Sequence, residues 1–276
     1  MSGRNFSDRG INMKKFAFGM LAAVAMTGSA FAADMAPRYT KAPAPAPVVV
    51  YSWTGCYIGG NVGGGWERTG QTRTGQQTAA GVFTALPADF GSSTGSDFIG
   101  GGQIGCDYQF ANNWVIGIQA MYDYARINSS HIVPAFPTFN SNVQVKDMWT
   151  VTGRVGYLFT PQLLGYVKGG GAWTRADYVI TGTVPAPFVS ETAFGVNRSG
   201  WTIGGGLEWM FAPGWSVFGE FNYMDFGTKT SVYAVGPTAI AGPFGTDVIR
   251  SKLEVEQFLV GVNYKFNFGG PVVARY

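Results

Sequence analysis

Two patterns in this sequence have residue types that could form a catalytic or binding site. Glycine clusters at residues 59–65 and 100–105 have the composition of phosphate-binding loops, but no Gly-Lys-Ser/Thr completes them and no helical pattern follows. His131 is the only histidine and follows Ser129 and Ser130. A single histidine excludes a multi-histidine zinc site, and adjacent loop residues do not supply the fixed geometry of a catalytic serine–histidine pair. The sequence therefore predicts no enzyme and no cofactor or metal.

Four charged residues are expected to face one enclosed interior. Arg154, Lys168, Glu208 and Glu220 each lie five to seven residues from a short turn, which places them at one level. They could line an ion path or form a plug of paired charges. The alternation along the chain predicts a closed barrel of eight strands, and side chains fill the interior of a barrel of that size. Buried charges must pair, so we favour the plug. We expect Arg154 and Lys168 within salt-bridge distance of Glu208 or Glu220.

Cys56 and Cys106 are the only two cysteines. Both are expected on the outward faces of neighbouring strands, at similar heights near the same end. One alternative is a cross-strand disulfide, which persists in an oxidising compartment. The other is a pair of free cysteines that act as small lipid-facing apolar side chains. We favour the disulfide, with the two Cβ atoms about 3.5–4.5 Å apart.

The elements that must position these residues are strands. From Trp53 onward, apolar residues recur at every second position in eight segments, with polar residues between them. In the fifth and weakest segment, Val167 and Trp173 are expected outward, with Tyr166 and Lys168 inward. The eight segments cover residues 53–66, 98–110, 114–124, 149–159, 163–174, 201–211, 215–223 and 257–266.

The connections between the segments alternate in length. Tight turns are expected around residues 111–113, 160–162 and 212–214. The longer stretches 67–96, 127–142, 176–198 and 227–251 are expected as loops. The pattern predicts an all-β fold: an eight-stranded antiparallel up-and-down transmembrane β-barrel with long extracellular loops and short periplasmic turns. A soluble lipocalin-like barrel would bury its apolar face, and eight such faces are too bulky for one small lumen.

The composition supports a membrane barrel. Aromatic residues make up 15% of the chain and charged residues only 13%, whereas soluble domains carry about 25% charged residues. Residues 1–32 contain four of the 19 basic and one of the 16 acidic residues, so the remaining chain has 15 of each. A neutral chain provides no electrostatic basis for binding nucleic acid.

The amino-terminal residues predict export. Residues 1–32 read as a leader with a signal peptide, whose natural start is expected at Met13 and whose cleavage pattern is Ala30-Phe31-Ala32. A Pro/Ala-rich periplasmic spacer is expected over residues 33–51. The outer-membrane barrel follows over residues 52–266, and residues 267–276 form a carboxy-terminal tail.

Four glycine- and aromatic-rich segments resemble a known family. They are WTGCYIGGNVG (residues 53–63), GGGQIG (100–105), GWTIGGG (200–206) and VGVNYKF (260–266). They resemble the alphaproteobacterial outer-membrane surface-antigen (immunogenic protein) family, which is related to the OmpA-type membrane domain. The resemblance covers the signal, the spacer and all eight strands. It implies an eight-stranded barrel in the outer membrane with a surface-exposed structural role, and it carries over no catalytic residues.

The last strand has the alternation of a barrel-assembly signal. Its outward residues are Phe258, Val260, Val262, Tyr264 and Phe266. Members of the family commonly end at the aromatic residue that corresponds to Phe266, whereas this chain continues to Tyr276. Either the tail rests in the periplasm or Tyr276 partly replaces Phe266 as the recognised end.

Together these observations predict a structural barrel and surface antigen that contributes to envelope integrity and makes surface contacts through its loops. The alternative is a narrow, porin-like channel for ions or small solutes. The expected partners are outer-membrane lipid and lipopolysaccharide, the barrel-assembly machinery, and an extracellular ligand or host surface. The spacer could also contact peptidoglycan. We expect location in the cell outer membrane.

Overall fold

The computed structural model describes residues 51–78, 80–110, 113–182, 188–235 and 246–266. The expected leader, the expected spacer before Tyr51 and the expected tail lie outside the described residues. Within those ranges, no helix is long and apolar enough to cross a membrane.

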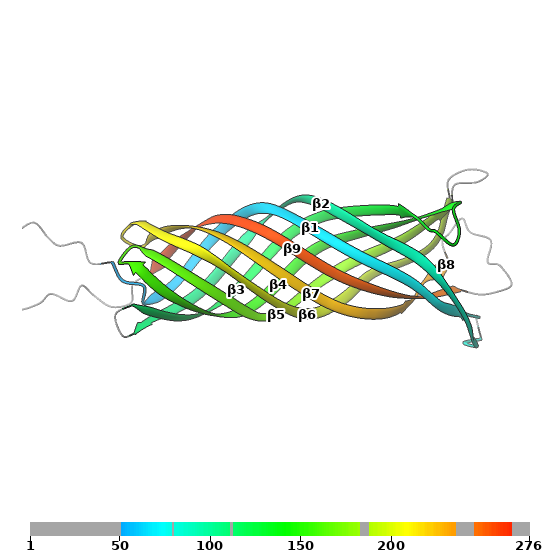
Figure 1. Cartoon of the computed structure of the whole chain (residues 1–276), viewed down its shortest axis with the longest axis horizontal. Helices are drawn as coiled ribbons and strands as arrows, with labels where there is room; N and C mark the ends of the chain where they lie inside the picture. The colour runs from blue at the N-terminus through cyan, green and yellow to red at the C-terminus, as the bar shows by residue number, and fades with distance from the viewer. Residues whose placement is uncertain (1–50, 79, 111–112, 183–187, 236–245, 267–276) are drawn as a thin grey trace, which may run out of the picture. The chain divides into compact units, whose positions relative to one another are not determined.

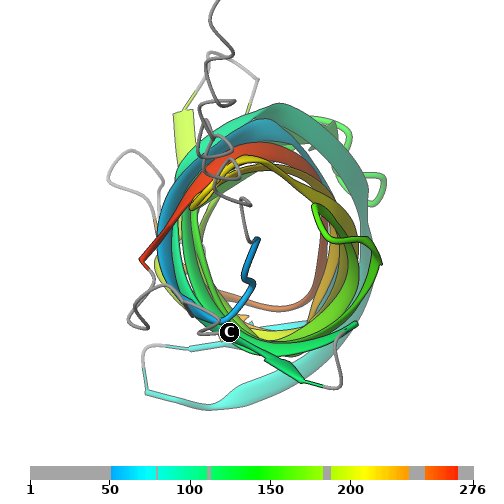
Figure 2. The same cartoon turned by 90° about the vertical axis from the view of Figure 1, so that its left-hand side faces the viewer.

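Eight long antiparallel strands close into a ring (Figures 1 and 2). Neighbours in sequence pair from β1 through β7, and β9 closes the ring by pairing with both β7 and β1. The two-residue β8 (Ala234–Val235) adds to β6, away from the β6–β7 pairing. The ring consists of β1 (Gly55–Gln77), β2 (Phe83–Phe110), β3 (Trp114–Ile132), β4 (Phe139–Thr160), β5 (Leu163–Gly182), β6 (Phe188–Ala212), β7 (Trp215–Val232) and β9 (Thr246–Phe266). The predicted eight-stranded antiparallel barrel is confirmed.

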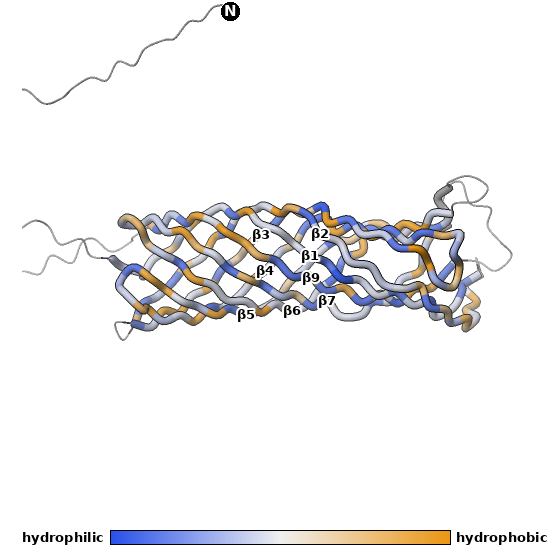
Figure 3. The backbone as a smooth tube through the Cα atoms, turned by 45° about the horizontal axis from the view of Figure 1, so that its top comes forward, coloured by the Kyte–Doolittle hydropathy of each residue, from blue (hydrophilic) through white to orange (hydrophobic). Residues whose placement is uncertain are grey.

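Side chains alternate between the outer surface and the interior, and hydrophobic and hydrophilic residues alternate along the strands (Figure 3). In β5, Val167 is 65% exposed and Lys168 only 5%. Trp173 is exposed and Tyr166 is buried, so the expected facing of this weak segment is confirmed. An exterior of apolar side chains is what a barrel in lipid requires.

The strands extend further than the sequence predicts. β1 and β2 stay paired as far as Gln77 and Phe83, and β3 and β4 as far as Ile132 and Asn140. Most residues of the four expected loops are therefore strand. Beyond the lipid a strand can carry polar side chains on both faces, so the apolar alternation ends while the backbone hydrogen bonds continue.

The interior contains two apolar clusters. At the end with the short turns, Trp53 is fully buried and its Nε1 donates to the Pro161 carbonyl oxygen at 3.0 Å. This first cluster comprises Trp53, Val115, Leu158, Leu164, Tyr166 and Met210. The second lies toward the long hairpins and includes Ile99, Met121, Ile127, Met148, Leu253 and Leu259. Of these apolar clusters, the sequence predicted only the inward position of Tyr166.

The last strand of the chain closes the ring against the first. Phe266 lies opposite Cys56, and Val260 opposite Val62. The outward side chains of this closing strand are the exposed residues Phe258, Val260, Val262, Tyr264 and Phe266. The residues expected as the assembly signal therefore form the lipid-facing side of the seam.

Candidate functional site

A layer of six charged side chains crosses the interior next to the Trp53 cluster. Its members come from six strands: Asp107 from β2, Arg154 from β4, Lys168 from β5, Glu208 from β6, Glu220 from β7 and Lys265 from β9. All six are buried. Alternation along each strand directs these side chains inward, and the paired register of Arg154 and Lys168 sets them at one level.

Arg154 lies at the centre of the layer. Its Nε donates to Asp107 Oδ1 at 2.8 Å, and its Nη1 donates to Glu208 Oε2 at 3.0 Å. The guanidinium carbon lies 4.9 Å from the centroid of the Tyr57 ring and 5.1 Å from that of Tyr166. Two carboxylates and two aromatic faces thus compensate the loss of water around this cation.

Lys168 forms the second expected pair. Its Nζ donates to Glu220 Oε1 at 2.6 Å and to Gln119 Oε1 at 3.0 Å. The Tyr166 hydroxyl donates to the other carboxylate oxygen of Glu220 at 2.7 Å. The structure thus places Arg154 on Glu208 and Lys168 on Glu220, inside the barrel.

Two members of the layer were missed by the sequence analysis. Lys265 Nζ donates to Asp107 Oδ2 at 2.6 Å and to the Trp53 carbonyl oxygen at 2.9 Å. Asp107 therefore bridges two cations, and the layer contains three cations and three carboxylates. The inward phase of Asp107, five residues before Asn112, is the signal that could have identified it.

A disulfide joins Cys56 and Cys106 on directly opposed positions of β1 and β2. Cys106 is exposed and Cys56 half-buried, so the bridge lies on the outer surface of the barrel wall. Its height is that of Phe266, at the short-turn end. Because the two cysteines are directly opposed on neighbouring strands, their side chains leave the wall on the same face.

The residues considered for catalysis are not arranged for it. Ser129 Oγ is hydrogen-bonded to Ser93 Oγ at 3.0 Å, and His131 Nε2 to the Phe90 carbonyl oxygen at 2.6 Å. The glycine clusters lie within strands that pack closely. A Cβ at Gly63 would overlap the carbonyl oxygen of Phe258 on β9.

A second charged group lies at the long-hairpin end. The Arg73 guanidinium contacts Asp247 at 3.4 Å and lies over the rings of Phe90 and Phe136, at 5.6 and 4.8 Å. The Asp247 backbone N–H donates to Glu191 Oε1 at 3.2 Å. Burial and, secondarily, the charge of Asp247 raise the pKa of Glu191 to about 8.

A closed ring with an apolar exterior and a layer of paired charges inside defines an integral outer-membrane barrel. The chain matches the family model of the outer membrane protein β-barrel domain over residues 18–266. It therefore belongs to that family and is an outer-membrane protein. By the rule for such barrels, the short turns are periplasmic and the long hairpins extracellular.

Two relatives are outer-membrane antigens. The 31 kDa outer-membrane immunogenic protein of Brucella melitensis is 29% identical over 92% of this chain and 100% of the relative. The 25 kDa outer-membrane immunogenic protein of the same species is 27% identical, over 87% and 92%. The predicted resemblance to this antigen family is confirmed. Among solved structures, the Escherichia coli protease OmpT aligns with 79% of this chain and 99% of its own at 10% identity, with a TM-score of 0.45. A likeness of that degree carries no information on activity.

The charged layer predicts a specific loss of stability. Asp107→Asn removes the carboxylate that two cations share, which leaves Lys265 without its acidic partner in a buried site. We expect the free energy of unfolding in lipid vesicles, measured by urea titration, to fall by about 3–5 kcal/mol. The control Asp97→Asn, at an exposed position of the same strand, should change it by less than about 0.5 kcal/mol. Equal effects of the two substitutions would show that Asp107 is not part of a buried ion network.

The disulfide predicts the number of free thiols. Protein that has been exported through the periplasm and is then denatured without reductant should bind no thiol-alkylating reagent. After reduction, two labelled thiols should appear. The bridge closes a loop with a sequence separation of 50, which should stabilise the barrel by about 2–4 kcal/mol. Two labelled thiols before reduction would exclude the bridge.

The raised pKa of Glu191 predicts that the stability of the wild type depends on pH. The ordinary pKa of the side chain is 4.5, so the folded state binds this proton more tightly than the unfolded state. The resulting stabilisation is complete below about pH 4.5 and is lost as the pH rises through about 8. Glu191→Gln, which mimics the protonated acid, should keep its urea midpoint between about pH 4.5 and 8, while the midpoint of the wild type falls across that range. Parallel midpoints at all pH values would contradict the assignment.

Proposed function

We propose that this protein is a structural, non-enzymatic outer-membrane barrel and surface antigen. It contributes to envelope integrity through the barrel and makes surface contacts through its extracellular hairpins. The observation that carries the proposal is the succession of side-chain groups inside the barrel: the Trp53 cluster, the charged layer and the larger apolar cluster follow one another along the lumen. Side chains packed in this way stabilise the barrel and leave no open channel through it.

The two ends of the chain fit the same role. The alternation that ends at Phe266 would be recognised by the barrel-assembly machinery, and the Pro/Ala-rich spacer over residues 33–51 would serve as a plain periplasmic tail, with contact to peptidoglycan as the alternative. The relatives whose names describe immunogenic outer-membrane proteins support surface exposure of the hairpins.

A narrow channel is the second candidate. Six charged side chains line one level of the lumen, which is the chemistry of an ion path. The pairing of those charges, with Lys168 Nζ 2.6 Å from Glu220 and Lys265 Nζ 2.6 Å from Asp107, favours the plug. The purified monomer in planar bilayers should therefore show at most small, rare currents. Steady, large conductance from a monomer would reject the structural proposal in favour of the channel.

A separation-of-function experiment tests the proposed role directly. One variant shortens the extracellular tip at residues 78–82 to a two-residue turn and leaves the paired strands and the contact of Phe136 with Arg73 intact. In a strain that lacks the native gene, both wild type and variant should restore resistance to detergent and to large antibiotics. Only the wild type should restore surface adhesion and antibody binding. Failure of the wild type to restore resistance would contradict the envelope role.

A further inference from the structure

On the outer face of β3, β4 and β5, the type of exposed side chain changes from aromatic to basic to polar toward the extracellular end. An aromatic row comes first: Tyr122 lies opposite Trp149, and Trp149 opposite Trp173. The Tyr122 and Trp149 ring centroids are 4.5 Å apart. Trp149 and Trp173 are exposed on the barrel wall. Aromatic residues concentrate at the lipid–water boundary, so this row marks the upper limit of the acyl chains.

A basic row follows directly above the aromatic row. It comprises Arg126 of β3, Lys146 of β4 and Arg175 of β5. The side chains of Lys146 and Arg175 are 45% and 59% exposed although each contacts a carboxylate, Lys146 that of Asp177 at 2.6 Å and Arg175 that of Asp147. The Arg126 guanidinium lies 5.6 Å from the Tyr124 ring centroid, and no acidic side chain of the described residues forms a salt bridge with it. Three cations thus face outward at one level.

Register shifts between β3, β4 and β5 determine where the side chains of Arg126 and Lys146 lie. The β3–β4 register shifts between Tyr124 and Ile127, and the β4–β5 register shifts between Val145 and Asp147. Arg126 and Lys146 lie within these two shifts. A β-bulge re-aims the side chains of its strand, and here two bulges on neighbouring strands meet at the same height. A third irregularity, between Ala176 and Tyr178, lies beside them on β5–β6.

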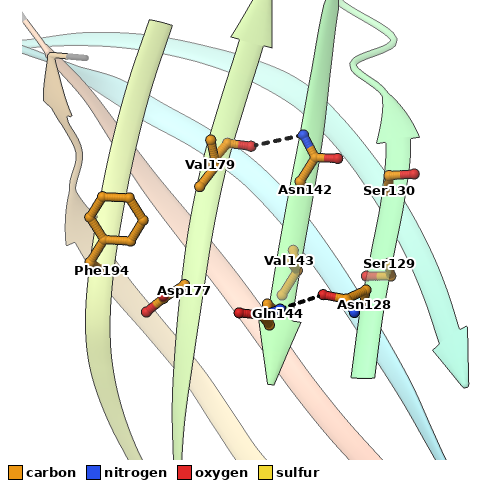
Figure 4. Close-up of a pocket in the computed structure, with 9 residues that line it drawn as sticks. All are labelled: Asn128, Ser129, Ser130, Asn142, Val143, Gln144, Asp177, Val179 and Phe194. Carbon is orange, nitrogen blue, oxygen red and sulfur yellow. Dashed lines mark hydrogen bonds between the residues drawn. The ribbon is translucent and has the colours of Figure 1, made fainter. Parts of the chain in front are cut away.

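Above the basic row the same strands form an open polar pocket of about 340 Å³ (Figure 4). Its amide groups belong to Asn128, Asn142 and Gln144, and Gln144 Nε2 donates to Asn128 Oδ1 at 2.7 Å. Ser130 lies at one side of the pocket, and Phe194 at the other. Amide and hydroxyl groups both donate and accept hydrogen bonds, which is the chemistry that recognises a saccharide.

Phe194 supplies a flat apolar surface to this pocket. It is 66% exposed, which is unusual for a phenylalanine far above the lipid-facing rows. The following Gly195 has φ of 62° and its N–H donates to Asp177 Oδ1 at 2.7 Å. A left-handed glycine in an antiparallel pair is typical of a bulge. The bulge and the Asp177 contact therefore hold the ring beside the amide groups, where it can stack on a sugar.

The opposite side of the barrel carries charges of both signs. On β7, β9 and β1, the acidic residues Asp225, Glu254 and Glu256 lie among the basic residues Arg68, Lys229, Arg250 and Lys252. On β3–β5 the basic residues Arg126, Lys146 and Arg175 exceed the carboxylates of Asp147 and Asp177.

We propose that the β3–β5 face binds a phosphorylated glycolipid of the outer leaflet. Its acyl chains lie along the apolar wall below Trp149 and Trp173, and its phosphates contact Arg126, Lys146 and Arg175. Its saccharide occupies the pocket beside Phe194. The order of the three surfaces along the barrel matches the order of acyl chain, phosphate and sugar in such a lipid. Arginine is well suited to phosphate because its planar fork donates two parallel hydrogen bonds. The inference rests on the proposed outer-membrane role and names one lipid partner for it.

The test uses the purified full chain in detergent and native mass spectrometry. The ligands are bis-phosphorylated lipid A, the same lipid without phosphates, and a lipopolysaccharide that carries core sugars. The basic-row variant is Arg126→Gln, Lys146→Gln and Arg175→Gln together. The matched control removes three charges from the other face: Arg68→Gln, Arg250→Gln and Lys252→Gln. The pocket variant combines Gln144→Ala with Phe194→Ala.

The basic-row variant should bind bis-phosphorylated lipid A about tenfold more weakly than the wild type, because it loses charge-assisted hydrogen bonds. The control variant should change this affinity by less than about twofold. The pocket variant should keep its affinity for lipid A and lose about fivefold for the core-bearing lipopolysaccharide.

Three results would overturn the proposal. They are equal losses for the basic-row and control variants, equal binding of phosphorylated and dephosphorylated lipid by the wild type, and an unchanged affinity of the pocket variant for the core-bearing lipid. The wild-type comparison needs no substitution, so misfolding of a variant does not prevent the test. Binding is measured without cells, so its failure leaves the resistance and adhesion results of the proposed function unaffected.

Discussion

A charge in the middle of a narrow closed ring has no bulk water to solvate it, and this constraint orders the interior of the barrel. Arg154 is fully enclosed, so it requires the carboxylates of Asp107 and Glu208 on either side. Asp107 in turn accepts from Lys265, whose ammonium also caps the Trp53 carbonyl oxygen. The charged layer and the periplasmic apolar cluster are thus one packed unit, and the chain segment before β1 is part of it.

The same alternation that directs charges inward gives the exterior its zones. Where lipid surrounds the barrel, outward positions must be apolar, and the wall carries residues such as Val151 and Val167. Where the strands leave the lipid, only the backbone hydrogen bonds must be preserved. Outward positions there are free to vary, and bulges near Arg126 and Lys146 re-aim side chains at that boundary. The side-chain types at outward positions are therefore restricted in the membrane-embedded half of the barrel and free to vary in the extracellular half.

The sequence predicts the constrained half well. Lipid imposes a period of two on every segment, so the eight strands, the short turns and even the facing of Lys168 could be inferred. The strand extension from Glu67 to Gln77 could not, because backbone pairing in water leaves no hydropathy pattern. The pairing of Arg154 and Lys168 with acids followed from counting distances to turns. The roles of Asp107, Lys265 and Trp53 could not be inferred in this way. The pairing of charges from six strands, and the position of Trp53 inside the barrel although it precedes β1, both depend on how the ring closes in three dimensions.

A double-mutant cycle on Asp107 and Lys265 tests the central claim, that the interior is a coupled network of paired charges. The free energies of unfolding in lipid vesicles would be measured for Asp107→Asn, Lys265→Met and the double variant, which retains the Arg154–Glu208 pair. A coupled network predicts that the double variant is less destabilised than the sum of the single variants by at least about 1 kcal/mol. Additive effects, within about 0.5 kcal/mol, would show that the two charges act independently and would contradict this account.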